Sequence, residues 1–261
     1  MNDQDSGEFY VGYLPRAPRH TARQVRFFCL ALIACAVVAA ILFVTGQHKF
    51  LPSVFEFQQD RQFEGVIHEK PYPMLSVQRP GNTGNQSAVS QYLLVGAGKH
   101  GAHADVAGFD GRHVRLQGTL IYRDGTTMIE IVPHSVTSTD LPSNVATGQS
   151  GVTKSAELGL FTLVGEIVDS KCYLGVMNPG STKPHRECAV RCISGGAPPL
   201  FIARDLKGRM VSLLLVSARG EPVNQQILDL VAEPVEITGQ VVSEGEQLYL
   251  RANPDSYKRV Q

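Results

Sequence analysis

Residues 118–131, GTLIYRDGTTMIEI, and residues 239–250, GQVVSEGEQLYL, carry one pattern twice. In each stretch a glycine opens an alternating apolar and polar run, an acidic residue beside a glycine interrupts it, and a second alternating run follows. Alternation with a period of two around a short Gly-containing turn is typical of a β-hairpin. Both stretches are therefore predicted to be hairpins, and their similarity indicates an internal duplication.

The duplication extends upstream of the hairpins. Residues 93–95 and 214–216 both read LLV, and they lie 121 positions apart, as Gly118 and Gly239 do. The copies open with residues 63–68, FEGVIH, and 164–169, VGEIVD. Each copy thus predicts three strands, a short helical or irregular connection, and a closing hairpin.

This element order resembles the OB-fold, a five-stranded barrel with a helix between its third and fourth strands. We therefore expect a mainly β protein with two OB-fold-like five-stranded barrels, over residues 60–137 and 160–261. Residues 138–159 between them are rich in Gly, Ser and Thr and lack apolar periodicity, which predicts a linker.

Residues 27–47 contain no charged side chain and are apolar on all sides. At about 1.5 Å per residue they can cross a hydrocarbon core of about 30 Å. A cleavable signal peptide is the alternative, but the run is longer than a typical signal core, and no cleavage motif follows it. The sequence predicts one transmembrane helix in the lipid bilayer.

Charges flanking this helix predict its orientation. Arg16, Arg19, Arg23 and Arg26 precede it, whereas only Lys49 and Arg61 follow it closely. Positive charge stays on the cytoplasmic side, so residues 1–26 are expected to be a cytoplasmic leader. We expect a single-pass protein of a bacterial inner membrane, with its C-terminal domains in the periplasm.

Composition and motifs limit the possible functions. The 24 Lys and Arg residues equal the 24 Asp and Glu residues, so no positive field favours nucleic acid, and none is expected as a partner. There is no Gly-x-Ser-x-Gly elbow, no His-Glu-x-x-His and no phosphate-binding loop. The chain is not expected to be an enzyme.

The two copies differ in one place. Gly65 and Val95 are 30 positions apart, whereas Gly165 and Val216 are 51 apart, so the second copy carries 21 extra residues between its first and third strands. The loop at 169–199 holds every cysteine outside the predicted membrane helix, together with one histidine: Cys172, His185, Cys188 and Cys192. The special chemistry of the chain is expected in this loop.

Two interpretations of the loop remain open. On a short helix ended by Gly195-Gly196, His185, Cys188 and Cys192 would share one face, and Cys172 could complete a Cys₃His site for zinc or copper. Alternatively, Cys172 forms a disulfide with Cys188 or Cys192, as exported domains often do. A third interpretation, in which one thiol takes part in thiol–disulfide exchange, is weaker because the chain has no Cys-x-x-Cys motif.

Neighbouring residues are expected to have ordinary roles. Glu166 and Asp169 could orient a ligand, but carboxylates at strand ends are usually solvated. Tyr173 and Met177 are expected to pack in the barrel or the loop. Three histidines of the first copy, His100, His103 and His113, are expected to be solvated rather than to bind a metal.

The segment from Lys171 to Gly180, KCYLGVMNPG, with residues 185–199, HRECAVRCISGGAPP, resembles a block found in membrane-anchored bacterial proteins with tandem OB-fold-like periplasmic domains. The resemblance covers about residues 165–203 and implies no particular activity. The overall layout is also similar to the haem chaperone of cytochrome c maturation, but that family's His-Asp-Glu-x-Tyr motif is missing, so none of its site residues is carried over.

Together these features favour a non-catalytic, membrane-anchored periplasmic protein that acts as a binding, assembly or accessory component of an envelope complex, with an envelope protein as partner. The alternative function is metal binding, or redox or metal transfer, through the Cys and His residues of the loop.

Overall fold

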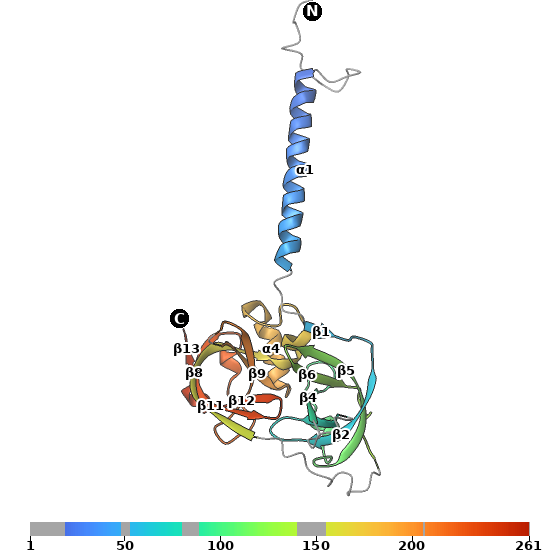
Figure 1. Ribbon diagram of the computed structural model, residues 1–261, viewed down its shortest axis with the longest axis vertical. Coiled ribbons are helices and arrows are strands. Elements are labelled where there is room, and N and C mark those ends of the chain that lie inside the picture. The colour runs from blue at the N-terminus through green and yellow to red at the C-terminus, as the bar shows by residue number, and fades with distance from the viewer. Residues whose placement is uncertain (1–18, 48–52, 80–88, 140–154, 206, 261) are drawn as a thin grey trace, which may run out of the picture. The chain divides into compact units, whose positions relative to one another are not determined.

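The computed structural model describes residues 19–47, 53–79, 89–139, 155–205 and 207–260 (Figure 1). The chain divides into two compact units, residues 1–51 and 52–261.

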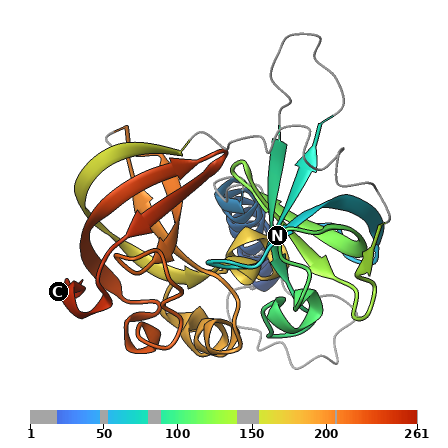
Figure 2. The same ribbon diagram turned by 90° about the horizontal axis from the view of Figure 1, so that it is seen from below.

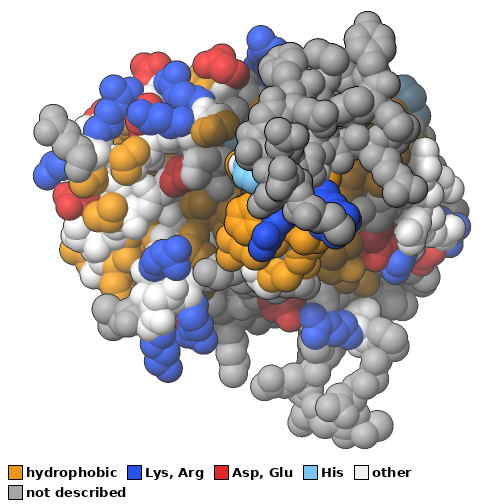
Figure 3. Space-filling model, turned by 90° about the horizontal axis from the view of Figure 1, so that it is seen from above, with side chains coloured by type: hydrophobic (Ala, Val, Ile, Leu, Met, Phe, Trp, Pro, Cys, Tyr) orange, Lys and Arg blue, Asp and Glu red, His pale blue; other side chains and the backbone are white. Residues whose placement is uncertain are grey.

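The first unit contains one helix, α1 (Arg19–Gln47), of 29 residues. An 18-residue window within Arg19–Gly46 has a mean hydropathy of 3.1, and the helix is long and apolar enough to cross a membrane. Large apolar side chains are exposed along its length, as Phe27 at 70% and Phe43 at 74% show. Figure 3 gives the view along α1 from its N-terminal end, where apolar side chains lie beside Lys or Arg side chains. The predicted apolar helix is confirmed, although it begins earlier, at Arg19.

The second unit begins with a closed five-stranded barrel. Its strands run in the order β5-β2-β3-β4-β6, and β6 pairs with β5 to close the ring. They are β2 (Arg61–His68), β3 (Met74–Gln78), β4 (Val89–Val95), β5 (His113–Arg123) and β6 (Thr126–Ile131). Short strands β1 (Ser53–Phe55) and β7 (Thr137–Ser138) also pair with β5, and helix α2 (His103–Val106) connects β4 to β5.

The second barrel repeats this order as β8-β9-β10-β12-β11, with β11 pairing back to β8. Its strands are β8 (Ser155–Asp169), β9 (Pro199–Arg204), β10 (Met210–Val216), β11 (Pro234–Glu244) and β12 (Gln247–Arg251). The 3₁₀ helix η3 (Leu228–Leu230) takes the place of α2, and η4 (Pro254–Ser256) and β13 (Lys258–Arg259) end the chain. In each barrel the third and fifth strands run parallel. Both have the predicted OB-fold order.

Repeated glycines explain why both copies close in the same way. Gly65 pairs with Val114 and Gly165 with Val235, at equivalent positions of the two barrels. A Cβ atom on Gly65 would lie 2.3 Å from the carbonyl oxygen of Ser76, and one on Gly165 would lie 2.2 Å from the equivalent oxygen on β9. Only glycine permits the first strand to approach the second this closely at that point.

The two barrels lie side by side (Figure 2), and they share one hydrophobic core. This core joins Met74 and Leu93 of the first barrel to Leu200 and Leu214 of the second. Tyr72 is fully buried at the contact. Its hydroxyl donates to the carbonyl oxygen of Leu215 at 3.0 Å and accepts from the backbone N–H of Val223 at 3.2 Å. The two predicted barrels therefore pack directly against each other.

The predicted linker at 138–159 lies mostly outside the described residues. At its ends the structure shows strand: Ser138 belongs to β7, and residues 155–159 belong to β8. Four of these residues, Ser155, Ala156, Glu157 and Gly159, pair with β11, and the register shifts at Leu158.

Tyr72→Phe should lower the free energy of unfolding by about 1–3 kcal/mol, because the buried carbonyl of Leu215 and N–H of Val223 lose their shared partner. Denaturant unfolding of the detergent-solubilised chain measures this change. Tyr122→Phe is the matched control, since Tyr122 is 36% exposed. Equal stability of the two variants would contradict a hydroxyl-mediated contact between the barrels.

Candidate metal-binding site

The 21-residue excess of the second copy forms a folded insertion between its first and second strands. The chain leaves β8 at Asp169, turns through the π-helix η1 (Cys172–Val176) and the 3₁₀ helix η2 (Lys183–His185), and enters helix α4 (Arg186–Ser194). It rejoins the barrel at β9.

The insertion packs directly on the first barrel. A Cβ atom on Gly175 would lie 2.7 Å from the carbonyl oxygen of Val54, and one on Gly195 would lie 2.1 Å from that of Lys99. Gly101 N–H also donates to the Gly195 carbonyl at 2.9 Å. The loop that sequence analysis singled out therefore lies at the junction of the two barrels.

Helix α4 ends as the sequence predicts but begins later. The N–H groups of Gly195 and Gly196 bond the carbonyls of Arg191 and Ile193, and Gly196 has the positive φ of 99° that favours glycine. His185 lies in η2 and at the N-cap position of α4 rather than inside that helix. The helical segment is nevertheless continuous from Lys183 to Ser194, so the predicted short helix is confirmed, and only its first turn, with Pro184 and His185, is 3₁₀.

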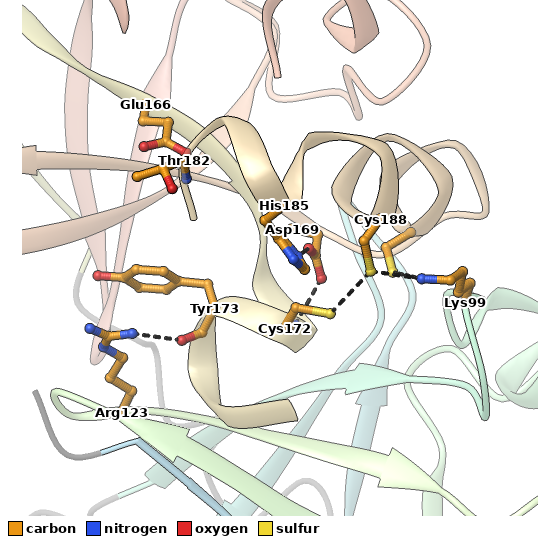
Figure 4. A network of polar contacts seen from close by, with 10 residues as sticks. Lys99, Arg123, Glu166, Asp169, Cys172, Tyr173, Thr182, His185 and Cys188 are labelled. Carbon is orange, nitrogen blue, oxygen red and sulfur yellow. Dashed lines mark hydrogen bonds and ion pairs between the residues drawn. The ribbon is translucent and has the colours of Figure 1, made fainter. Parts of the chain in front are cut away.

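The three cysteines of the insertion nevertheless come together (Figure 4). Sγ of Cys172 lies 3.8 Å from Sγ of Cys188. Cys172 and Cys192 are buried, Cys188 is half-buried, and all three are free thiols. The disulfide alternative predicted the proximity of Cys172 and Cys188, but the bond itself is not formed in this structure.

A buried carboxylate holds the histidine in place. Nε2 of His185 lies 3.0 Å from Oδ2 of Asp169, and Oδ1 of Asp169 accepts the backbone N–H of Cys172 at 2.8 Å. Asp169 is 0% exposed and His185 is 3% exposed. Asp169 was expected to be solvated, but the insertion folds back over the end of β8 and buries it.

These side chains form two overlapping groups. Ligand atoms of Cys172, His185 and Cys188 all lie within 4.8 Å of one another, and so do those of Asp169, Cys172 and Cys192. The structure therefore brings all four predicted site residues together. Cys172 belongs to both groups because η1 places it between α4 and the end of β8.

Lys99 of the first barrel completes the cluster. Its Nζ lies 2.7 Å from Sγ of Cys188 and 3.9 Å from Sγ of Cys192. Sequence analysis missed this residue because it lies 89 positions before Cys188 and no motif marks it. Lys171, also missed, is buried, and its Nζ donates to the carbonyls of Gly96 and Gly98 at 3.0 and 2.7 Å, which fixes the loop that carries Lys99.

Hydrogen bonding, burial and nearby charge shift the pKa values of Cys172 and Cys192 in opposite directions. The hydrogen bond that Cys172 donates to Cys192, together with burial, raises the pKa of Cys172 well above its usual value. The same hydrogen bond, aided by the charge of Lys99, lowers the pKa of Cys192. The hydrogen bond with Cys188 raises the pKa of Lys99, which favours its cationic form. A cation beside these sulfurs favours thiolate.

Other residues from the sequence analysis have different surroundings. Tyr173 packs in the shared core under the guanidinium of Arg123, 4.3 Å from its ring centroid, as expected. Met177 is 45% exposed, so the prediction that it packs was wrong. Glu166 is half-buried and accepts the backbone N–H of Thr182, and burial raises its pKa.

The remaining histidines lie apart from this cluster. His100 and His103 are exposed, and Nδ1 of His113 lies 2.6 Å from the hydroxyl of Thr139.

No protein-family model matches the chain, and no curated protein matches it. The proposed function therefore rests on the residues of the site and their geometry.

Replacing Lys99 should change thiol acidity. Lys99→Met removes the cation near Cys192, so the Cys192 thiolate should form only at higher pH. Thiolate absorbance, titrated in reduced protein, measures the shift. Lys207→Met, in the exposed turn before β10, is the control and should leave the titration unchanged. Coinciding titrations of Lys99→Met and wild type would contradict the role of Lys99.

Proposed function

We propose that the protein is a membrane-anchored metal-binding protein of the bacterial envelope, which holds a soft cation, Zn²⁺ or Cu⁺, in its Cys/His insertion. The observation that carries this proposal is the 3.8 Å distance between Sγ of Cys172 and Sγ of Cys188, with a nitrogen of His185 in the same group. Two thiolates that bind one tetrahedral zinc at about 2.3 Å lie about 3.8 Å apart.

The donor set supports this proposal. Thiolate and imidazole are the ligands that zinc and monovalent copper prefer, and carboxylate–water sites for magnesium or calcium need oxygen donors instead. Cys172, His185 and Cys188 supply three donors, and Cys192 lies near Cys172 as a fourth. When bound, the cation would stabilise the thiolates that burial alone disfavours.

The Asp169–His185 pair is the arrangement that supports a metal-binding histidine. A carboxylate bonded to one ring nitrogen fixes the orientation of the imidazole and increases the basicity of the other nitrogen. In this chain the carboxylate also bonds the backbone of Cys172, so one side chain orients two of the proposed ligands.

The anchor and its flanking arginines support the proposed location. Helix α1 is the candidate membrane span, and Arg19, Arg23 and Arg26 lie in its first turns. Positive charge at that end favours a cytoplasmic N-terminus, which would expose the barrels and the insertion to the periplasm.

A second candidate is a non-catalytic assembly or accessory component of an envelope complex, and one observation favours it. Strand β8 exposes four large apolar side chains: Leu158 at 51%, Leu160 at 71%, Phe161 at 43% and Val164 at 54%. Large apolar side chains that remain exposed on one element often contact another protein. Metal binding and assembly can coexist, because β8 and the Cys/His insertion present different residues.

Metal analysis of the full chain, purified in detergent under reducing conditions, tests the proposed function. We expect about one zinc or copper ion per chain after addition of the ion and removal of excess. Cys188→Ser and His185→Ala should lose that ion, whereas Cys35→Ser, a cysteine of α1, should retain it. Wild-type protein that folds but binds neither ion would overturn the proposal.

Asp169→Asn should weaken metal binding by about 10–100-fold without removing a thiolate or imidazole ligand, because the ring of His185 loses its carboxylate partner. Competition with a chelator measures the affinity, and circular dichroism verifies the fold. Asp205→Asn, at the exposed turn after β9, is the control. An unchanged affinity in Asp169→Asn would exclude His185 as an oriented ligand.

A further inference from the structure

Lys99 and Cys188 approach each other more closely than a hydrogen bond explains. Nζ lies 2.7 Å from Sγ, which is the lower end of the range for N–H···O bonds, about 2.7–3.2 Å. Sulfur is larger than oxygen, so an N–H···S bond is longer than an N–H···O bond. A nitrogen and a sulfur that are both bonded to one bent oxygen atom, in contrast, lie close to this separation.

The backbones on both sides of this contact are fixed. Lys171 bonds the carbonyls of Gly96 and Gly98 in the loop that carries Lys99. On the other side, Gly101 N–H donates to the Gly195 carbonyl at the end of α4, and Gly195 has no room for a Cβ beside the Lys99 carbonyl. The amine and the thiol are therefore held together by the packing of the barrels.

The contact is also accessible to a small oxidant. Lys99 is exposed and Cys188 is half-buried, whereas Cys172 and Cys192 are buried. Cys188 is thus the thiol of the cluster that dioxygen or peroxide reaches first. Oxidation of a thiol follows its accessibility and its thiolate character, and a neighbouring nitrogen can trap the oxidised sulfur.

We propose that Lys99 and Cys188 are a redox-modification site, at which dioxygen joins Nζ to Sγ through a single oxygen atom. One N–H bond and the S–H bond break, and an N–O bond and an O–S bond form. The second oxygen atom leaves as water with the two hydrogens. Dioxygen accepts four electrons, two from nitrogen and two from sulfur.

The N–O–S bridge is a reversible lock between the barrels. It fastens the β4–α2 loop of the first barrel to helix α4 of the second barrel's insertion. Four equivalents of thiol reductant return the amine, the thiol and one water, and yield two disulfides of the reductant. The bridge requires no metal ion, so the inference is independent of the proposed function, although it removes Cys188 from the donor set.

The mass of the intact, full-length chain tests the inference. After aerobic purification with a chelator, we expect the mass to exceed the sequence mass by about 14 Da, one oxygen gained and two hydrogens lost. Peptide mapping should then find Lys99 and Cys188 in one cross-linked species, and dithiothreitol should release them.

Matched variants separate the bridge from other products. Lys99→Arg keeps the charge but lacks a primary amine, so the added mass should vanish, and Cys188→Ser should have the same effect. Lys207→Arg and Cys192→Ser should retain the added mass, since neither residue is part of the bridge.

Three results would overturn the inference. A chain two hydrogens lighter with Cys172 joined to Cys188 would establish a disulfide, and the same mass with Lys99 joined to Cys188 would establish a direct S–N bond. Unmodified Lys99 and Cys188 after exposure to dioxygen and peroxide would exclude oxidative coupling. Metal content, measured in reduced protein, reports separately on the proposed function.

Discussion

A buried ammonium group is the constraint on which the arrangement of the two barrels depends. The side chain of Lys171 is 4% exposed, and its Nζ lies 3.1 Å from Glu130 and bonds two backbone carbonyls of the β4–α2 loop. An unpaired ammonium in such a place would cost several kcal/mol, so the second barrel's insertion is stable only with the first barrel against it. The contact between Lys99 and Cys188 depends on this packing, because the two residues belong to different barrels.

The shared core has the same consequence for the cysteines. Cys172 and Cys192 are members of the apolar cluster that joins the barrels, and Tyr173 and Leu174 pack beside them. Their sulfurs are therefore positioned by hydrophobic packing as well as by local turns. Such a scaffold positions the donor atoms near one another, and a preorganised donor set reduces the ordering cost of binding.

Much of the fold could be predicted from the sequence because it rests on local signals. Gly118 and Gly239 open equivalent hairpins, and the turn at Asp124-Gly125 has the positive φ angles of a two-residue hairpin loop. The excess length of the second copy likewise pointed to the Cys and His residues. The contact between the barrels could not be predicted in this way, because neither Tyr72 nor Lys171 belongs to a periodic pattern.

The site residues that could not be predicted also depend on contacts between segments that are distant in the sequence. In the sequence, Asp169 is a carboxylate at the end of a predicted strand. It is buried because the insertion folds over it. Lys99 follows a glycine-rich segment that could suit any surface turn, and it meets Cys188 only because the first barrel packs against α4. Residues close in sequence thus defined the candidate ligands, while residues from the other barrel determine their charge and chemistry.

Cys188 has neighbours from both barrels. It is the most accessible thiol of the cluster, it lies 3.8 Å from Cys172, and it is the sulfur nearest to Lys99. A sulfur in the proposed N–O–S bridge is no longer a thiolate, so Cys188 cannot be an anionic metal ligand and part of the bridge at the same time. The two barrels are similar, and the insertion in one of them places a single thiol in both the proposed metal site and the proposed bridge.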